Sequence, residues 1–496
     1  MICLPEPDPA ILARKPQIVR ALIALAPSGT VIDDDLRLAA YETDALTAYR
    51  QRPLAVVLPQ TTEEVSAVVR YAHEEGLNVV PRGAGTSLSG GAVPAADAIV
   101  IGLAKLSRIL SIDFENRCVV AQCGVPNLGI SHAVAQRGFY YAPDPSSQIA
   151  CTIGGNVAEN SGGVHCLKYG LTTNNLLGIE LVLPDGVVVR LGGRYLDAGH
   201  YDLLGLMAGS EGLLGIVTEV TVRILKRPAS ARALLIGFAT TEGAADCVAA
   251  VIAAGIIPAG MEMMDRPAIE AAEAFVHASY PLDAEALLIV ELDGPAVEVN
   301  DLIGRVSELA REHGASSVRA SESEAERLAF WAGRKAAFPA VGRLSPDYYC
   351  MDGTIPRREL PRTLREIHRM SEHYGLRVAN VFHAGDGNLH PLILYDANRP
   401  GELERAEAFG AEILKHCVDA GGVLTGEHGV GLEKRDLMPY QFTAVDLEMQ
   451  HRVKRAFDPH ARFNPGKVFP TLRRCVEDGR KHVHAGAERF PELPRF

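Results

Sequence analysis

The order of apolar and polar residues predicts a strand followed by a helix in the first clearly patterned region of the chain. Leu54–Leu58 is an unbroken apolar run of strand length, and apolar residues then recur at helical spacing from Val65 to Ala72. Thr61 followed three residues later by Glu64 is the pattern of a capping box, in which each side chain bonds the other residue's backbone N–H. The spacing predicts that the helix begins at Thr61.

A second predicted strand leads into the first of three glycine-dense segments. Asn78–Val80 has strand composition and runs directly into Pro81–Gly91, which is rich in glycine and serine. We expect this segment to form a loop, and likewise Thr152–Gly163 and Gly209–Gly215. Since glycine lets a backbone come close to a ligand, the three segments are the first candidates for a binding site.

The pattern changes near Pro228. Before it, Gly178–Leu183 and Val187–Leu191 flank Pro184-Asp185-Gly186, which predicts a β-hairpin. After it, helical stretches dominate and alternate with short apolar strands, which is the pattern typical of a separate α+β domain. The predicted elements of this second part are Ala286–Leu292 as a strand and Val297–His313, Glu322–Phe330 and Gly401–Ala420 as helices.

The length supports more than one domain, because 496 residues exceed what one hydrophobic core usually serves. We expect an N-terminal helical segment at 1–52, a first domain at 53–228, a second domain at 229–470 and a tail at 471–496. With 49 basic and 61 acidic residues the net charge is −12, which excludes a protein that coats nucleic acid by bulk charge. Any bound anion must therefore be held by positive or N–H groups gathered at its own binding site.

The cysteines and the apolar runs indicate a cytoplasmic protein. The nine cysteines include no pair separated by two residues, so neither a zinc ribbon nor an iron–sulfur motif is present. The N-terminus has acidic residues and prolines where a signal peptide would be basic and apolar. The longest apolar stretch, Val248–Met261, is interrupted by glycine and proline and is shorter than the ~20 residues of a membrane helix.

The first glycine segment fits neither of two common phosphate-binding motifs. A Rossmann loop needs glycine three positions after Gly85, where this chain has Leu88, and a P-loop needs Gly-Lys-Ser/Thr, where Gly90 is followed by Gly91-Ala92. The remaining functional interpretation is a nest of backbone N–H groups around a pyrophosphate. The alternative for this segment alone is a plain surface turn.

Together with its companions, the segment resembles the flavin-dependent oxidase family typified by vanillyl-alcohol oxidase, from about Leu54 to Arg223. The resemblance implies an α+β, two-domain vanillyl-alcohol-oxidase-type fold, with an FAD-binding domain of the PCMH type and a substrate or cap domain of mixed sheet and helices. It also implies that Glu211-Gly212 and Gly215–Val217 form the strand that closes over the adenine side. Family members that link FAD covalently have histidine where this chain has Thr86, so we expect non-covalent FAD.

The residues that this resemblance implies as FAD contacts belong to four segments of the predicted first domain. They are Pro81, Arg82, Gly83, Ala84, Gly85, Thr86, Ser87, Pro143, Asp144, Thr152, Gly154, Gly155, Asn156, Asn160, Ser161, Gly162, Gly163, Glu211, Gly212, Gly215, Ile216 and Val217.

A second group of candidate residues lies in the C-terminal half. Val378–His383 is predicted as a strand and Ala384–Asn388 as a turn, so His383 and His390 can converge across the reversal. Two histidines and one carboxylate, with Glu427 as the candidate, make a metal site with open positions. His428 has the pKa range of a general base. The alternative is a set of ordinary hydrogen-bonded histidines in loops.

Five motifs in this half resemble the D-2-hydroxy acid dehydrogenase branch of the flavin family, and this resemblance covers nearly the whole chain. They are Trp331–Lys335, Ser345–Pro356, His383–Pro391, Gly426–Gly429 and Phe463–Lys467.

This narrower resemblance implies a role for each candidate. His383, His390 and Glu427 hold a divalent metal, which we expect to be zinc, manganese or iron, and His428 takes the hydroxyl proton. Arg334 pairs with the substrate carboxylate and Asn464 reaches FAD. Relatives that use larger dicarboxylates have a lysine near the position of Tyr349; its absence here favours a small substrate.

We therefore expect an FAD-dependent enzyme that oxidises glycolate, or another small D-2-hydroxy acid, to glyoxylate or the corresponding 2-oxo acid. The resemblance further implies that electrons pass to a second flavin subunit and an iron–sulfur subunit of one oxidase complex. We expect a cytoplasmic protein, attached to the inner membrane only through those subunits.

Three alternatives stay open at this point. A D-lactate dehydrogenase on the same scaffold would differ only in a pocket that accommodates one more methyl group, and such a difference changes the binding free energy by only ~1–3 kcal/mol. An electron-transfer or assembly subunit would keep FAD without substrate chemistry, and a non-flavin metal-binding module would lack the flavin.

Overall fold

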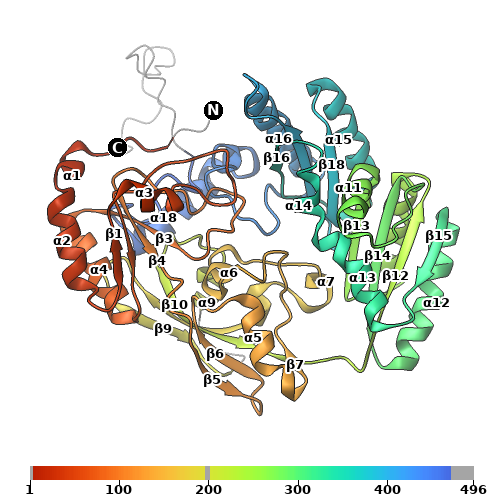
Figure 1. The fold of residues 1–496 in the computed structure, drawn as a ribbon, viewed down its shortest axis with the longest axis horizontal. Helices are drawn as coiled ribbons and strands as arrows, with labels where there is room; N and C mark the ends of the chain where they lie inside the picture. Colours follow the sequence, from red (N-terminus) through yellow and green to blue (C-terminus); the bar gives the residue numbers. More distant parts are fainter. Residues whose placement is uncertain (1–3, 196–200, 471–496) are drawn as a thin grey trace.

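The computed structural model describes residues 4–195 and 201–470, and the chain folds into two halves that lie side by side (Figure 1). The N-terminal half contains a four-stranded and a five-stranded sheet, and the C-terminal half contains an eight-stranded sheet. The predicted tail lies outside the described residues, and the predicted domain bounds at 52, 228 and 470 stay a prediction.

The four-stranded sheet is mainly parallel and is buried on both faces. Alternate residues of its strands belong to two different apolar clusters, as the period of two requires: Val57 packs with α2 and α4, and Val56 packs on the opposite face. In spatial order the strands are β1 (Thr30–Ile32), β2 (Ala55–Leu58), β4 (Ala98–Gly102) and β3 (Asn78–Arg82), and the covering helices are α2 (Lys15–Leu25) and α4 (Thr62–Glu75).

The predicted strand–helix–strand unit is confirmed as β2, α4 and β3, but only half of the capping box forms. Thr61 accepts the backbone N–H of Glu64 as predicted (3.2 Å). The Glu64 carboxylate instead accepts the backbone N–H groups of Gln60 (2.8 Å) and Ser28 (2.7 Å). Glu64 thereby ties α4 to the loop that follows α2.

The five-stranded sheet is antiparallel and contains the predicted hairpin, whose strands are β8 and β9. Its central strand β10 alternates buried and half-buried residues along its whole length, which is the pattern of a strand with one face on a core. The strands in spatial order are β5 (Ile109–Asp113), β6 (Cys118–Gln122), β10 (Ile216–Arg223), β8 (Leu176–Val182) and β9 (Val188–Gly192), and β7 (Phe139–Tyr140) pairs with β11 (Leu225–Lys226) beside it.

Two sequence-based expectations about this half were wrong. Residues 153–159 of the expected loop Thr152–Gly163 form a helix, α6 (Ile153–Glu159), because Thr152 caps its first turn and Gly154 lets the helix pack directly on Cys123. Glu211 and Gly212 lie in a turn and not in a strand, since both have positive φ and β10 begins only at Ile216. The other helices of this half are α1 (Pro9–Ala13), α3 (Asp35–Leu38), α5 (Asn127–Val134), α7 (Cys166–Tyr169), α8 (Thr172–Asn175) and α9 (Leu203–Met207).

The eight-stranded sheet is antiparallel and has helices on both faces. Leu288 and Val290 of β14 pack in one apolar cluster with α10, α12, α15 and α16, whereas Leu287 and Ile289 pack in another with α11, α13 and α14. The strands are β15 (Ala315–Ala320), β12 (Ser230–Phe238), β14 (Ala286–Gly294), β13 (Gly260–Asp265), β18 (Val378–His383), β19 (Asn388–Tyr395) and β16 (Asp347–Cys350), with β17 (Gly353–Thr354) beside β19.

The predicted helices and strand of this half are present as α12, α13, α16 and β14. The helices are α10 (Thr241–Ala253), α11 (Arg266–Val276), α12 (Ala296–Glu312), α13 (Glu324–Lys335), α14 (Ala337–Val341), α15 (Leu360–Tyr374) and α16 (Glu402–Asp419). None of the helices within residues 4–195 and 201–470 combines the length and apolar character that crossing a bilayer requires.

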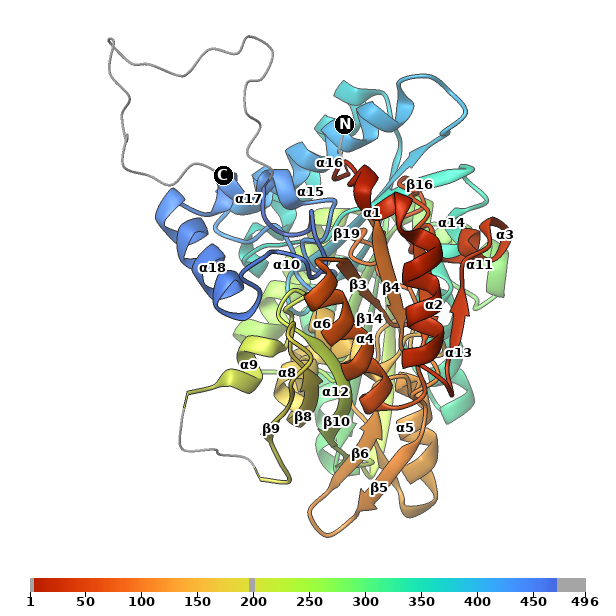
Figure 2. The same ribbon diagram turned by 90° about the vertical axis from the view of Figure 1, so that its left-hand side faces the viewer.

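The last described segment leaves the C-terminal half and returns to the N-terminal one. α17 (Met438–Gln441) still packs beside α16, and α18 (Ala444–Phe457) follows it, both in blue in Figure 2. Lys454 on α18 donates to the backbone carbonyl of Leu213 (2.7 Å), and Asn464 donates its backbone N–H to Val79 of β3 (2.7 Å). Residues near 464 are thereby held beside the strand that leads into the first glycine segment.

A charged network joins the two halves through His165, which precedes α7. Its Nδ1 lies 2.9 Å from the Asp144 carboxylate and its Nε2 lies 3.4 Å from the carboxylate of Glu291 on β14. Glu291 also accepts from Arg327 (2.7 Å) and from the indole N–H of Trp331. Burial alone would lower the pKa of His165, but the two carboxylates raise it to about 10.

This network predicts a pH-dependent contribution to stability. Because the folded-state pKa of His165 is raised from 6.5 to about 10, the stabilisation is complete below about pH 6.5 and is lost as the pH rises towards 10. We expect His165→Gln to lower the free energy of unfolding by roughly 1–3 kcal/mol near pH 6.5 and by much less at pH 10. The measurement is the thermal midpoint across this pH range, with His368→Gln at an exposed surface pair as the control. Wild-type and His165→Gln midpoints that stay equally separated at every pH would contradict the assignment.

Candidate functional site

A cavity of about 440 Å³ is lined by residues of both halves. Its lining includes Pro81–Ser87, much of α6, and the predicted histidines and glutamate of the C-terminal half. One cavity is therefore bordered by both groups of candidates that the sequence singled out.

Most of the predicted FAD contacts line this cavity, and five of them do not: Pro143, Asp144, Asn160, Gly162 and Gly163. Asp144 bonds His165, and Asn160 ends α6 and accepts the backbone N–H of Thr173 (2.9 Å). A Cβ at Gly163 would lie 2.5 Å from the Asp144 backbone, and a Cβ at Gly162 would lie 2.5 Å from Glu427 Oε2. These residues support the cavity wall instead of forming its surface.

The glycines of the first segment are required by close packing. A Cβ at Gly83 would lie 2.5 Å from the Thr152 hydroxyl that caps α6, so the segment and the helix meet without room for a side chain. Gly85 has φ +71°, a conformation that favours glycine, and lies against the Arg82 guanidinium. The segment is therefore a fixed shape on one wall of the cavity.

Asn464 presents an unused acceptor in the cavity lining. Its side-chain N–H₂ donates to the backbone carbonyls of Gly91 (3.0 Å) and Glu211 (2.8 Å), which fixes the orientation of the amide. Its Oδ1 is buried and has no hydrogen-bond partner. Buried acceptors are usually satisfied, so this oxygen fits a donor from a bound molecule such as FAD.

Two glutamates lie near the predicted FAD contacts, and the sequence analysis named only one of them, Glu211. Glu159, at the end of α6, lines the cavity and was missed, because a single glutamate ending a segment of small residues carries no distinctive pattern. Its Oε2 is buried without a partner, and burial beside Glu211 raises its pKa well above the usual value. The carboxylate of Glu211 accepts the backbone N–H groups of Val430 and Gly431 (both 2.7 Å). Glu211 therefore holds the loop that carries Glu427 and His428.

The hairpin of β18 and β19 places both predicted metal-binding histidines on one face of the sheet. His390 pairs with Val381, which lies two residues before His383 on the same strand, and residues two apart share a face. His383 Nε2 lies 3.1 Å and His390 Nε2 lies 3.2 Å from Glu427 Oε1. Ligand atoms that each lie about 2.0–2.2 Å from one ion have separations of this size.

The other ring nitrogens of the two histidines are held by acceptors. His390 Nδ1 lies 3.2 Å from the carbonyl of Met351, and His383 Nδ1 lies 2.8 Å from the carboxylate of Glu262. A carbonyl only accepts, so Nδ1 of His390 carries the hydrogen and Nε2 of a neutral ring directs a lone pair at the Glu427 carboxylate. A cation between His390 Nε2 and the Glu427 carboxylate would replace this repulsion between lone pairs by attraction. A carbonyl and a carboxylate that accept from the other ring nitrogen are the usual second-sphere partners of metal-binding histidines.

The arrangement of His383, His390 and Glu427 also determines how their charges are stabilised. Burial alone would lower the pKa of His383, but Glu262 and Glu427 raise it well above its usual value. Burial alone would raise the pKa of Glu427, but the two histidines hold it well below its usual value. The site is therefore built to keep a positive charge beside an ionised Glu427.

The loop that carries Glu427 and His428 is held by Asp352, a residue that the sequence analysis did not single out. The buried Asp352 carboxylate accepts the backbone N–H groups of Gly426 (3.0 Å), Glu427 (3.2 Å) and His428 (2.9 Å). Burial alone would raise its pKa, but the His428 ring, the Lys434 ammonium and the His390 ring nearby hold it well below the usual range. Because three successive N–H groups bond to one carboxylate, they fix the backbone positions from which the side chains of Glu427 and His428 extend.

His428 lies against His390, and its ring is free to accept a proton. The two rings stack with centroids 4.7 Å apart and planes within 9°. Nδ1 of His428 is buried and has no hydrogen-bond partner, and burial lowers the pKa of the ring to about 4. His428 is therefore a neutral base at neutral pH.

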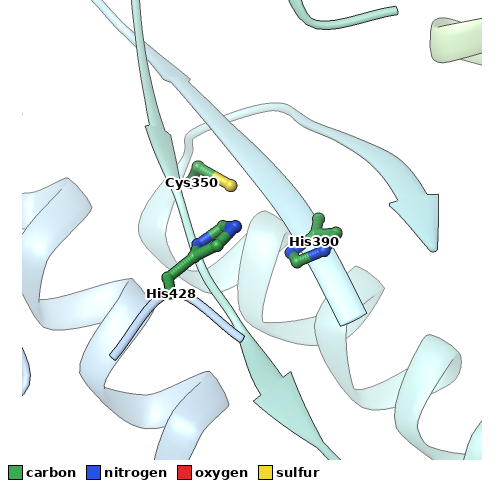
Figure 3. A group of neighbouring side chains, drawn as sticks. All are labelled: Cys350, His390 and His428. Atoms are coloured by element: carbon green, nitrogen blue, oxygen red, sulfur yellow. The ribbon is translucent and has the colours of Figure 1, made fainter. Parts of the chain in front are cut away.

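Figure 3 shows Cys350, which the sequence analysis did not assign, beside His390 and His428. The possible metal-binding atoms of these three residues lie within 4.8 Å of one another.

Arg334, the predicted partner of the substrate carboxylate, is bound to a protein carboxylate. It is only 1% exposed, and its guanidinium contacts Glu262 through Nε (2.8 Å) and Nη2 (2.6 Å). The other oxygen of Glu262 holds His383. Arg334 is not among the residues that line the cavity, whereas the next residue, Lys335, is.

Two family models match the chain. Residues 53–192 match the FAD binding domain, and residues 227–468 match the C-terminal domain of FAD linked oxidases.

Proteins of known name are similar over most of the chain. The glycolate oxidase subunit GlcD of Escherichia coli (strain K12) is 55% identical over 97% of this chain and 96% of its own length. GlcD of Bacillus subtilis (strain 168) is 37% identical over 91% of this chain and 95% of its own length. A D-lactate dehydrogenase of Anaerostipes hadrus is 33% identical, over 91% and 97%.

Solved structures share the fold at low sequence identity. p-Cresol methylhydroxylase with substrate bound superposes with a TM-score of 0.80 at 17% identity, covering 95% of this chain and 99% of that one. 4-Ethylphenol oxidase of Gulosibacter chungangensis gives a TM-score of 0.77 at 17% identity, covering 94% and 99%. The predicted α+β, two-domain vanillyl-alcohol-oxidase-type fold is confirmed, and the chain belongs to the family of FAD-linked oxidases as an FAD-binding oxidoreductase.

Proposed function

We propose that this enzyme oxidises glycolate, or a similarly small D-2-hydroxy acid, to the 2-oxo acid with FAD as hydride acceptor. The observation that carries the proposal is the single cavity lined by the flavin-binding segments, by His383, His390 and Glu427, and by His428. The similarity to two glycolate oxidase subunits, at 55% and 37% identity, favours glycolate over D-lactate, since the D-lactate dehydrogenase is 33% identical.

The cofactor set follows from the residues around the cavity. Pro81–Ser87 and the buried Oδ1 of Asn464 would hold FAD, bound without a covalent link because Thr86 offers no histidine ring. His383, His390 and Glu427 would hold a divalent ion of zinc, manganese or iron. When bound, the flavin supplies a hydride acceptor and the ion supplies a Lewis acid that lowers the pKa of a hydroxyl group.

The protein's own groups then position and deprotonate the substrate. His428 is neutral at neutral pH and takes the hydroxyl proton as the hydride leaves Cα. Its ring is oriented by stacking on His390 and by the loop bonds to Asp352, so the base does not have to be ordered during the reaction. Pairing of Arg334 with the substrate carboxylate stays a prediction: Glu262 contacts Nε and Nη2 of the guanidinium, whereas Nη1 is buried without a hydrogen-bond partner.

We further propose that the reduced flavin is reoxidised by partner subunits. The relatives from Escherichia coli and Bacillus subtilis are named as subunits, and this sequence has no cysteine motif for an iron–sulfur cluster. A second flavin subunit and an iron–sulfur subunit would carry the electrons on. The proposed location is the cytoplasm, with attachment to the inner membrane only through those subunits.

The proposed function is tested by an anaerobic spectral titration of the purified flavoprotein. We expect glycolate to bleach the flavin absorbance, D-lactate to do so at higher concentration, and D-2-hydroxyglutarate to have little effect, because no lysine stands near Tyr349 for a second carboxylate. Chelation should slow bleaching and added metal should restore it. Acid precipitation should leave the flavin in solution. A flavoprotein that none of the three acids bleaches would overturn the proposal.

The role of His428 is tested by His428→Ala. We expect FAD to stay bound and the rate of flavin reduction by glycolate to fall by about 10²–10⁴-fold, because a positioned base typically contributes this much. The measurement is anaerobic stopped-flow reduction, with His132→Ala, on the exposed side of α5, as the control. An unchanged rate of reduction would exclude His428 as the base.

The role of Asp352 is tested by Asp352→Asn. The amide keeps the shape of the side chain but loses the charge that receives the N–H groups of residues 426–428, so the Glu427 carboxylate should be less well placed. We expect metal affinity to fall by about 10–100-fold while the flavin content is unchanged. Metal and flavin are measured together after dialysis, with Asp347→Asn on β16 as the control. A wild-type ratio of metal to flavin in Asp352→Asn would contradict this role.

A further inference from the structure

We propose that Glu159, at the end of α6, is held as a neutral carboxylic acid and donates its O–H to the isoalloxazine ring of FAD. A donor of this kind stabilises the electron-rich reduced ring, so it makes the flavin a stronger oxidant. The inference rests on the proposed FAD site and not on the identity of the substrate. It assigns a role to a cavity-lining carboxyl that the proposed chemistry leaves unused.

The nearest carboxyl group disfavours a negative charge on Glu159. A Cβ at Gly429 would lie 2.4 Å from Glu159 Oε2 and 2.9 Å from Glu211 Oε1, so both carboxyls lie against one glycine. Glu211 accepts the backbone N–H groups of Val430 and Gly431 (both 2.7 Å), whereas Oε2 of Glu159 is buried and has no partner. Two adjacent carboxyls do not both ionise readily, and the hydrogen-bonded one keeps the charge. The proton therefore stays on Glu159.

The other charged groups nearby do not reverse this result. The groups that act most strongly on the Glu159 carboxyl are Glu211, Asp44 and Lys434. The ammonium of Lys434 lies 3.2 Å from the Glu433 carboxyl and 3.7 Å from that of Asp352, so it already serves two other acids. Burial raises the pKa of both Glu159 and Glu211, and that of Glu159 lies well above its usual value.

The second oxygen of Glu159 lies at the wall that carries the predicted FAD contacts. Oε1 would lie 3.1 Å from a Cβ at Gly91, and the Ser87 hydroxyl bonds to the same carboxyl. Gly91 and Ser87 line the cavity, as Glu159 itself does. With the O–H on Oε1, Oε2 is left as a neutral carbonyl oxygen, and burying it without a partner costs much less than burying a charge.

The position of Glu159 along α6 favours the flavin ring over the pyrophosphate. Thr152, at the start of the helix, lies against Gly83 of the segment in which we expect the pyrophosphate. Glu159, about 10 Å further along the helix, lies against Gly429, which directly follows the proposed base His428. Because the reacting ring must face that base, Glu159 is at the ring end of the cofactor.

Asn464 supplies an acceptor beside this donor. Its amide N–H₂ donates to the carbonyls of Gly91 and Glu211, both of which border Glu159, and its Oδ1 has no partner. The pyrimidine edge of isoalloxazine carries one N–H between two carbonyl groups. An adjacent acceptor and donor match this edge, whereas an ionised Glu159 would be repelled by its carbonyl oxygens.

The test compares the reduction potential of the bound flavin in the full-length wild type, Glu159→Gln, Glu159→Met and an exposed control on α4, Glu74→Gln. Potentials are measured anaerobically against a reference dye, and FAD affinity by fluorescence titration of the apoprotein, so no substrate is needed. We expect Glu159→Met, which has no donor, to lower the equilibrium constant for two-electron reduction about tenfold, or about 30 mV. Glu159→Gln, whose amide still donates, should stay close to wild type, as should the control.

An infrared difference spectrum of the wild type, oxidised against reduced, gives a second measurement. We expect the band of a neutral carboxyl group to shift on flavin reduction and to be missing from Glu159→Gln. If Glu159→Met does not retain flavin, this band decides, and its absence from the wild type overturns the proposal.

The remaining outcomes are distinct. A higher potential in both Glu159→Gln and Glu159→Met overturns the proposal, because removal of a negative charge has that effect. An unchanged potential in Glu159→Met, even with weaker FAD binding, overturns the bond to the ring. A protein that binds no FAD overturns this inference and the proposed function together. A wild type that holds FAD but is bleached by no 2-hydroxy acid overturns the proposed function alone.

Discussion

The candidate site depends on one buried carboxylate, that of Asp352, which receives the backbone N–H groups of residues 426–428. An ionised carboxylate away from water is unfavourable by several kcal/mol unless it is paired and hydrogen-bonded. Here the N–H groups, the Thr425 hydroxyl (2.6 Å) and the buried ammonium of Lys434 (3.7 Å) meet that requirement. The charge requires the loop to take this conformation, and the loop in turn presents Glu427 and His428 to the cavity.

The same loop is held from the other half of the molecule by Glu211, which accepts from Val430 and Gly431. Gly162 provides the space that the Glu427 carboxylate occupies, since a Cβ there would lie 2.5 Å from Oε2. The predicted metal ligands therefore come from the C-terminal half, but their positions are defined by contacts with both halves. The predicted FAD contacts and the proposed substrate site at the histidines border one cavity because this loop joins the two walls.

Local patterns in the sequence predicted those parts of the site that short-range geometry determines. His383 and His390 could be placed together because a short turn separates two apolar strands, and a hairpin of that kind leaves few registers. The glycine segment at Pro81–Gly91 could be assigned because glycine is needed wherever backbones approach closely. Thr152–Gly163 was misassigned because a helix whose glycines serve packing has the composition of a loop.

The parts that were missed depend on contacts between distant residues. Nothing beside Glu262 in the methionine-rich β13 indicates that it lies between Arg334 and His383, which are 72 and 121 residues away. The same is true of Asp352 and of Glu159, whose neighbours in sequence are not their neighbours in space. The role implied for Arg334 came from a motif, and the motif does not report which carboxylate the guanidinium meets.

The contact between Glu211 and Val430 has a consequence for the order of events during synthesis, since 219 residues separate the two. At about 5–20 residues per second, roughly 10–45 seconds pass between the appearance of the carboxylate and that of the N–H groups that bind it. For that interval the first half of the chain has its flavin-binding segments but no partner for Glu211. The loop that carries Glu427 and His428 can therefore join the N-terminal half only after the glycine-rich segments of that half have been made, and Asn464 of the same cavity follows later still.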